Sequence, residues 1–271
     1  MVTRRRFLEN GLGAGAIVTV ASALGCARAT RSEAGRGEQT QGRLSARPRR
    51  SGQSTTAPPS PALVPGEQAL GLGQGRDGLL YVPRDLPKNR PVPLILLLHG
   101  ARGGAKGVIS RVGAFALADE FKMLVLAPDS RDGTWDVIHG GFGPDVTFID
   151  SALDHVFSRL PIDPARLVVA GFSDGASYAL SLGLINGDLF SHVIAFSPGF
   201  LVAKQRQGKP LIYVTHGTDD EILPIDSTSH RLVPALRTAG YTVEFRVFAG
   251  PHTVPPPIAH EAFEWLFKPR E

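Results

Sequence analysis

The chain has 271 residues, enough for one large domain or two small ones, and its composition, 42% hydrophobic and 20% charged, is that of a globular protein. Its formal net charge of +4 comes from the N-terminal part, since residues 1–52 hold ten arginines and three acidic residues, and the remainder holds 19 basic and 22 acidic residues. The remainder therefore offers no basic footprint for nucleic acid. A single cysteine, Cys26, excludes an intrachain disulfide and a cysteine-based zinc site.

Residues 1–29 have the pattern of an export signal. Three arginines at positions 4–6 precede Phe7 and Leu8, and a Gly- and Ala-rich apolar run follows over residues 11–24. This run is shorter than the about 20 residues of a comfortable membrane span. It resembles a twin-arginine signal, and a retained N-terminal anchor helix is the alternative. The sequence thus predicts export from a bacterial cytoplasm to the periplasm, the cell envelope or the medium.

Cys26 has two predicted fates. It follows Ala23-Leu24-Gly25 and resembles a lipoprotein attachment site, although Ala23 stands where that pattern prefers leucine. A lipid on Cys26 would tether the protein to a membrane. Cleavage after the Ala-x-Ala sequence at residues 27–29 would instead remove Cys26 from the mature chain, and the sequence leaves both open.

Residues 30–66 contain mainly Arg, Ser, Thr, Gln, Gly and Pro, so we expect a disordered linker there. Residues 67–271 alternate strand and helix patterns and are expected to form a single domain. The strand-like apolar runs are 79–82, 93–98, 123–127, 167–170, 192–196, 211–215 and 242–248. Helical patterns cover 108–120, 145–160, 176–183, 229–239 and 258–267. This alternation predicts an α/β fold, with a mainly parallel, doubly wound sheet and helices on both faces.

A Gly-x-Ser-x-Gly motif, Gly171-Phe172-Ser173-Asp174-Gly175, joins a strand pattern to a helical pattern. This is the context of a nucleophile elbow, in which a serine occupies a sharp strand-to-helix turn. Both glycines are needed there, because a Cβ at either position would crowd the neighbouring strand or helix. The motif makes Ser173 the candidate nucleophile.

A serine hydroxyl needs a base to accept its proton and a group to orient that base. His230 and His260 lie within predicted helices, where surface or packing roles are expected. His252 lies in a Gly- and Pro-rich loop after the last strand, so it is the predicted base. The acid should follow an earlier strand end, where the sequence offers three candidates. These are Asp219, Asp220 and Glu221. The order serine, acid, histidine is that of an α/β-hydrolase.

An oxyanion formed at Ser173 needs preorganised donors. We expect one from the backbone N–H of Asp174, directly after the nucleophile. The second should come from the Gly-rich loop over residues 99–104, with Ala101 as the first choice and Arg102 as the second.

Aromatic residues near these motifs suggest a substrate pocket. Trp135 and Phe142 are its predicted lining, with a place in the core as the alternative, which we favour for Phe172. Asp145 opens a helical pattern and is expected to be a helix cap rather than a catalytic acid. The segment between residues 196 and 211 is short, so little or no lid is expected.

Four ordered motifs carry a resemblance to a known family over about residues 78–268. They are His99-Gly100, the Ser173 elbow, the run from His216 to Pro224, and Gly250-Pro251-His252. In these motifs the chain resembles α/β-hydrolases of the carboxylesterase/phospholipase group, close to polyhydroxyalkanoate-depolymerase-like and acyl-protein-thioesterase-like esterases.

The resemblance implies a role for particular residues. In the family's His-Gly-x-x-Asp-x-x-x-Pro pattern the acid is the fifth residue, which is Asp220, whereas Asp219 occupies a variable position. Pro251 stands where the family often has glycine, which bears on loop flexibility and not on the identity of the base. The family needs no metal or cofactor.

These features together predict a serine hydrolase with a Ser173–His252–Asp220 triad that cleaves small or polymeric esters or thioesters through an acyl-enzyme. A peptidase or acyltransferase with the same triad is the first alternative. A non-catalytic secreted binding protein on a hydrolase scaffold is the second. The acyl group, the alcohol and the oligomeric state are left open by the sequence.

Overall fold

The computed structural model describes residues 42–49, 63–87 and 90–268. The predicted export signal, with Cys26, and most of the predicted linker lie outside the described residues. Among the helices of the described part, none is long and apolar enough to cross a membrane.

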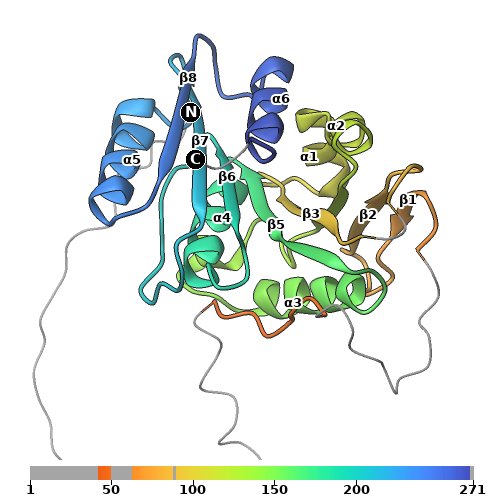
Figure 1. Cartoon of the computed structure of the whole chain (residues 1–271). Coiled ribbons are helices and arrows are strands. Elements are labelled where there is room, and N and C mark those ends of the chain that lie inside the picture. Colours follow the sequence, from red (N-terminus) through yellow and green to blue (C-terminus); the bar gives the residue numbers. More distant parts are fainter. Residues whose placement is uncertain (1–41, 50–62, 88–89, 269–271) are drawn as a thin grey trace, which may run out of the picture. The chain divides into compact units, whose positions relative to one another are not determined.

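An eight-stranded sheet forms the centre of the domain (Figure 1). Its strands are β1 (Gly66–Ala69), β2 (Gly78–Val82), β3 (Val92–Leu98), β4 (Leu124–Pro128), β5 (Ile162–Phe172), β6 (His192–Phe196), β7 (Leu211–Gly217) and β8 (Val243–Phe248). The spatial order is β1-β2-β4-β3-β5-β6-β7-β8, with β1 and β2 antiparallel to their neighbours and β3 to β8 parallel. The predicted α/β class, with a mainly parallel sheet in one domain, is confirmed.

The central strands are buried on both faces. In β3, Leu94, Leu96 and Leu98 belong to one apolar cluster, whereas Ile95 and Leu97 belong to the other. Successive side chains of a strand point to opposite faces, which explains why β3 is an unbroken apolar run. The edge strand β1 was not predicted, because its sequence Gly-Glu-Gln-Ala carries no apolar signal.

In the described part of the chain, six α-helices lie on the two faces of the sheet (Figure 1). On one face, α1 (Ala105–Val112), α2 (Ala114–Phe121) and α6 (Pro256–Trp265) contribute to one apolar cluster. On the other, α3 (Pro144–Phe157), α4 (Asp174–Ile185) and α5 (Ser229–Thr238) contribute to the second. Two short 3-10 helices, Asp136–His139 and Ile225–Ser227, lie in loops.

The single helix expected over residues 108–120 is wrong in detail. Gly113 has φ 69° and separates α1 from α2. Its N–H bonds back to the carbonyl of Ser110, which ends α1 in the left-handed conformation that glycine adopts without strain. The first helix also begins earlier than expected, at Ala105.

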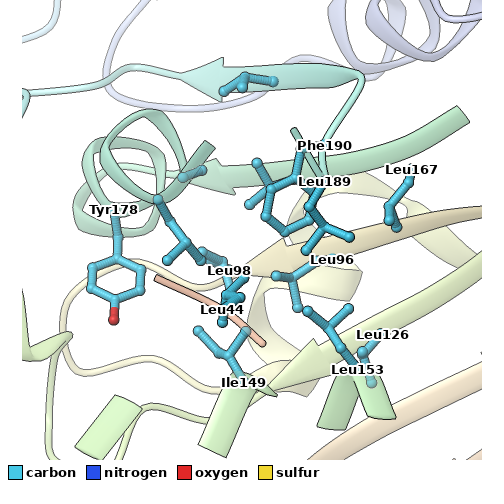
Figure 2. Packing of buried hydrophobic residues seen from close by; sticks show 14 of the residues in the cluster. Leu44, Leu96, Leu98, Leu126, Ile149, Leu153, Leu167, Tyr178, Leu189 and Phe190 are labelled. Carbon is cyan, nitrogen blue, oxygen red and sulfur yellow. The ribbon is translucent and has the colours of Figure 1, made fainter. Parts of the chain in front are cut away.

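Residues 42–49, which we call the 42–49 segment, pack against the domain, so the disorder expected for this part of the linker is wrong. Leu44 is only 3% exposed and lies in the apolar cluster beside Ile149 and Leu98 (Figure 2). The Leu44 N–H donates to the side-chain oxygen of Asn186 at 2.9 Å. The Asn186 amide donates in turn to the carbonyl of Gly42 at 2.7 Å.

Polar contacts hold the rest of the 42–49 segment. Arg43 and Arg47 both form ion pairs with Asp188, at 2.7 and 3.0 Å. The hydrogen bond from Arg43 is the main reason that the pKa of Asp188 falls to about 2. The backbone N–H groups of Ser45 and Ala46 both donate to Asp150 at 2.8 Å. Two arginines that composition assigned to a solvated linker therefore have fixed partners.

Candidate active site

The turn between β5 and α4 places Ser173 in a strained position. Its φ and ψ are 58° and −121°, a conformation that non-glycine residues rarely adopt. A Cβ on Gly171 would lie 2.2 Å from the carbonyl oxygen of Gly175, and a Cβ on Gly175 would lie 2.3 Å from that of Leu98. Both glycines are thus required by close backbone approach, as the motif predicts. The Ser173 N–H bonds to the carbonyl of Phe196 at 2.9 Å, which fixes the turn to β6.

Three residues from separate loops meet at this turn. The Oγ atom of Ser173 lies 2.9 Å from Nε2 of His252. Nδ1 of His252 lies 2.6 Å from Oδ2 of Asp220. With Asp220 as acceptor, His252 carries its proton on Nδ1, which leaves Nε2 free to accept the hydroxyl proton of Ser173.

Asp220 is buried and accepts hydrogen bonds at both oxygens. Oδ1 accepts the N–H groups of Ile222 and Leu223 at 3.0 and 2.8 Å. Oδ2 faces Nδ1 of His252 at 2.6 Å and Nε2 of His216 at 3.1 Å. Burial by itself would raise the pKa of Asp220, but the hydrogen bond from Leu223 and the two histidines outweigh it and lower that pKa. The carboxylate is therefore ionised at neutral pH.

His216, at the carboxyl end of β7, supports the acid and was not given a role by sequence reasoning. Its Nε2–H donates to the carbonyl of Leu223 at 2.7 Å, so Nδ1 accepts the hydroxyl proton of Ser229 at 2.7 Å. Burial lowers the pKa of His216 and keeps the ring neutral. The available signal was the position of His216 as the first residue of the His-Gly-x-x-Asp pattern, because a side chain four residues before the acid can contact that acid.

The His252 loop is fixed to the end of β7 by backbone contacts. The N–H groups of Thr218 and Asp219 donate to the carbonyls of Phe248 and Gly250, each at 2.9 Å. A Cβ on Gly217 would lie 2.3 Å from the Gly250 carbonyl oxygen, so this approach needs glycine.

Among the described residues, the other candidate acids and histidines form no hydrogen bond or ion pair with Ser173 or His252. Asp219 and Glu221 are exposed. His230 pairs with Asp226 and His260 with Glu120, each at 2.8 Å on exposed surface. Both histidines have the surface positions expected of them.

Backbone donors for an oxyanion are available at two of the three predicted positions. Within the described residues, the N–H groups of Ala101 and Asp174 donate no hydrogen bond. The N–H of Arg102 is already donated to the carbonyl of Gly133 at 2.6 Å, so Arg102 as the second-choice donor is wrong. Arg102 instead has φ 56° and turns the loop.

His99 holds the loop that carries Ala101. Its Nε2 accepts the N–H of Ser130 at 2.9 Å, so the proton is on Nδ1, which donates to the carbonyl of Gly100 at 2.7 Å. Burial is the main cause that lowers the pKa of His99. The buried ring is thus a neutral support for the loop and not a second base.

A cavity of about 280 Å³ lies beside Ser173 and His252. Three further walls of it are the 99–104 loop, helix α1 and the exposed side chain of Ile222. Phe172 also lines it and packs on His252 with ring centroids 4.7 Å apart. Phe172 is therefore both a core residue and a cavity wall.

The predicted pocket residues Trp135 and Phe142 do not line this cavity. Trp135 is fully buried, donates its Nε1–H to the carbonyl of His99 at 2.7 Å, and stacks on Tyr178. Phe142 packs on the same tyrosine with centroids 5.7 Å apart. Trp135 is therefore a core residue and the half-buried Phe142 packs against the core, because both rings find partners on the α3 and α4 side of the sheet.

Asp145 is also different from the expected cap. Gly143 occupies the N-cap position of α3, and Asp145 lies in the first turn. Its carboxylate accepts the N–H groups of Arg131 and Asp136 at 2.6 and 2.7 Å, which fixes the loop before the helix. Burial raises the pKa of Asp145 to about 6.

The segment between β6 and β7 lies along α4 and does not line the cavity. The N–H of Gly199 donates to Ser177 Oγ, and that of Val202 to Ser181 Oγ, both at 2.9 Å. The described part of the chain thus has no large lid over Ser173. It also contains no group of three or more His, Cys, Asp or Glu side chains arranged to hold a metal ion.

Two family models match the chain. Residues 141–263 match one described as phospholipase/carboxylesterase, and residues 71–201 match one described as putative esterase. Together the two matches span β2 to α6, including Ser173, Asp220 and His252.

Curated relatives match part of the chain. A probable feruloyl esterase C from Aspergillus niger is 29% identical, over 56% of this chain and 57% of that protein. An acetylxylan esterase from Coprinopsis cinerea is 30% identical, over 50% of this chain and 39% of that protein. The chain thus spans less than two thirds of the length of these relatives.

Solved structures with this fold include a fluorophosphonate-binding serine hydrolase F from Staphylococcus aureus. It has TM-score 0.60 and 15% identity, and the match covers 76% of this chain and 100% of that one. The esterase PE8 has TM-score 0.56 and 20% identity, over 69% of this chain and 95% of that one. At these identities the likeness concerns the fold.

Proposed function

Because the chain is an α/β-hydrolase of the carboxylesterase type, we propose that it hydrolyses carboxylic esters with Ser173 as nucleophile, His252 as base and Asp220 as orienting acid. One observation carries the proposal. Ser173 Oγ and Asp220 Oδ2 lie 2.9 and 2.6 Å from opposite nitrogens of His252, beside a cavity that can admit a substrate.

In the first half of the reaction, Ser173 Oγ attacks the ester carbonyl carbon as His252 Nε2 accepts the hydroxyl proton. The imidazolium that forms is stabilised by Asp220, which remains ionised and holds the ring in orientation. The low pKa of Asp220 and the fixed Nδ1 contact support this role. The alcohol then leaves with the proton from His252, and the acyl group stays on Ser173.

In the second half, water attacks the acyl-enzyme and gives its proton to His252, which returns it to Ser173 Oγ as the acid leaves. The oxyanion in each half needs donors in place beforehand, and one such donor is worth roughly 3–4 kcal/mol. The free N–H groups of Asp174 and Ala101 suit this role. Gly100 allows the approach, because a Cβ there would lie 3.3 Å from the Cβ of Ser173.

The comparisons favour an ester over an amide as substrate, since both curated relatives described above are named esterases. Hydrolysis of p-nitrophenyl acetate, measured beside an aminoacyl p-nitroanilide, tests this preference. Faster turnover of the anilide would replace the proposal with the peptidase alternative.

The Ser173→Ala substitution tests the nucleophile. We expect ester hydrolysis to fall by at least about 10⁴-fold, because the remaining groups stabilise the transition state without covalent attack. Covalent labelling by a fluorophosphonate should be lost as well. The exposed Ser110, on α1 outside the cavity, offers a matched control, and Ser110→Ala should keep both signals. Labelling of Ser173→Ala at the wild-type rate would contradict the assignment.

Export is proposed from the sequence of residues 1–29. Mass spectrometry of the mature N-terminus decides between a lipid on Cys26 and cleavage after residue 29.

A further inference from the structure

The cavity beside Ser173 has an unusual distribution of charge. Its lining consists of His99, Gly100, Ala101, Gly103, Gly107, Val108, Arg111, Phe172, Ser173, Ile222 and His252. Of these, Arg111 alone carries a permanent charge, and no lining residue is acidic. A substrate that enters the cavity therefore meets one fixed cation against otherwise neutral walls.

The exposed Arg111 lies over the ring of Phe172 at the cavity. It lies in the last turn of α1, and its guanidinium carbon is 4.6 Å from the ring centroid of Phe172. The Phe172 ring packs in turn on His252, with centroids 4.7 Å apart. The cation is thus positioned by the same ring that packs on the proposed base.

Arg111 also lacks an anionic partner. Among the described residues its guanidinium forms no ion pair or hydrogen bond, whereas Arg43, Arg47 and Arg166 each pair with an aspartate. Planar N–H groups free to donate are suited to binding a carboxylate in a bidentate geometry. Arg111 also lies where a cation stabilises the C-terminal end of a helix, but that effect does not require a position over Phe172.

We propose that Arg111 binds a carboxylate carried by the substrate, so that the preferred substrates are esters with a free carboxylate on the acyl or the alcohol part. This proposal rests on ester cleavage at Ser173. It adds a substrate class and a specificity-determining residue to that reaction.

The test compares charged and neutral esters of matched shape. For the acyl side, the p-nitrophenyl monoester of adipic acid is compared with p-nitrophenyl hexanoate. For the alcohol side, 3-acetoxybenzoate is compared with 3-acetoxybenzamide. We expect the ratio of kcat/KM, charged over neutral, to exceed one in at least one pair, and the pair that shows it identifies the side that carries the carboxylate. Added salt should lower that ratio.

Substitution then assigns the preference to Arg111. In Arg111→Met the ratio should fall by about tenfold, the scale of one charge-assisted contact, and Arg111→Lys should restore part of it. The matched control is Lys106→Met, because Lys106 lies on the same helix but lines a different groove. This control should keep the ratio, and thermal melting should show that all variants are folded.

The possible results separate the two proposals. If the wild type hydrolyses no ester at all, the proposed function fails. If neutral esters are hydrolysed but both ratios are one or less, or if Lys106→Met lowers the ratio as much as Arg111→Met, only the role of Arg111 is overturned.

Discussion

Two buried histidines lie at the carboxyl ends of strands of the same sheet, His99 directly after β3 and His216 near the end of β7, and they differ in an instructive way. Each follows or closes a parallel strand, and burial lowers the pKa of each. They differ in tautomer: His99 donates from Nδ1 to the Gly100 carbonyl, whereas His216 donates from Nε2 to the Leu223 carbonyl. In both, a backbone carbonyl fixes the proton. In His99 and His216 the ring N–H donates to a backbone carbonyl, and the histidine holds a neighbouring segment in place. In His252 the ring N–H faces the carboxylate of Asp220 instead, which suits the histidine to act as a base.

Of these two histidines, His216 should have the larger effect on catalysis, because its ring contacts the carboxylate of Asp220 directly. His216→Ala should lower kcat/KM by about 10²-fold, less than the about 10⁴-fold loss when a triad acid is replaced, because Asp220 itself and its contact with His252 remain. The free energy of unfolding should fall by about 2–4 kcal/mol, since Ser229 and Leu223 lose a buried partner.

His216→Gln should recover more activity than His216→Asn, because a glutamine amide can donate from the position of Nε2. Equal recovery by the two amides would contradict the assigned tautomer. A changed pH profile of kcat/KM in His216→Ala would separate an effect on the acid from simple loss of stability.

A smaller effect is expected from His99, which acts on the oxyanion donor through the loop. His99→Ala should lower kcat by about tenfold, which is less than the about 10²- to 10³-fold loss expected when an oxyanion donor is removed. The pH profile of kcat should not change. Here His99→Asn should recover more than His99→Gln, since the donor is Nδ1. His230→Ala, on exposed surface, is the control and should change kcat by less than twofold; if His99→Ala resembles it, the loop does not depend on His99.

The smallest effect is a dependence of stability on pH. The unfolded chain binds protons at both histidines below about pH 6.5, whereas the folded chain resists this, so the free energy of unfolding should fall as the pH drops below about 6.5. Asp145, with its pKa raised to about 6, has the opposite effect between about pH 4 and 6. Urea unfolding of wild type and His216→Gln at pH 7.5 and 6 isolates the histidine contribution, because Asp145 is common to both. If the free energy of unfolding changes by the same amount between the two pH values in both proteins, a protonation difference at His216 is contradicted.

The sequence was sufficient to predict the three triad residues, but not the residues that hold the surrounding loops in place. Ser173, Asp220 and His252 could be named because each lies in a short motif after a predicted strand. Trp135 was misassigned because its true partner, the His99 carbonyl, is 36 residues away in the chain. Arg102 was misassigned for a similar reason, as its N–H is taken by Gly133. Local patterns find groups that chemistry requires, whereas long-range hydrogen bonds decide which neighbours remain free.

The 42–49 segment shows that long-range contacts also decide which residues are ordered. Its composition is that of a solvated linker, and the distant residues Asp150, Asn186 and Asp188 give many of its polar groups partners. A propensity averaged over residues 30–66 cannot detect one leucine that fills an apolar site.

This segment also has a consequence for the order of folding. Its side-chain partners outside the segment lie 104 to 145 residues further along the chain, so these contacts can form only after α3 and α4 have been synthesised. We expect contacts of such long range to form after the folding transition state, and contacts of that kind slow unfolding without speeding folding. The 42–49 segment is therefore expected to lengthen the lifetime of the native domain more than it raises the rate of folding.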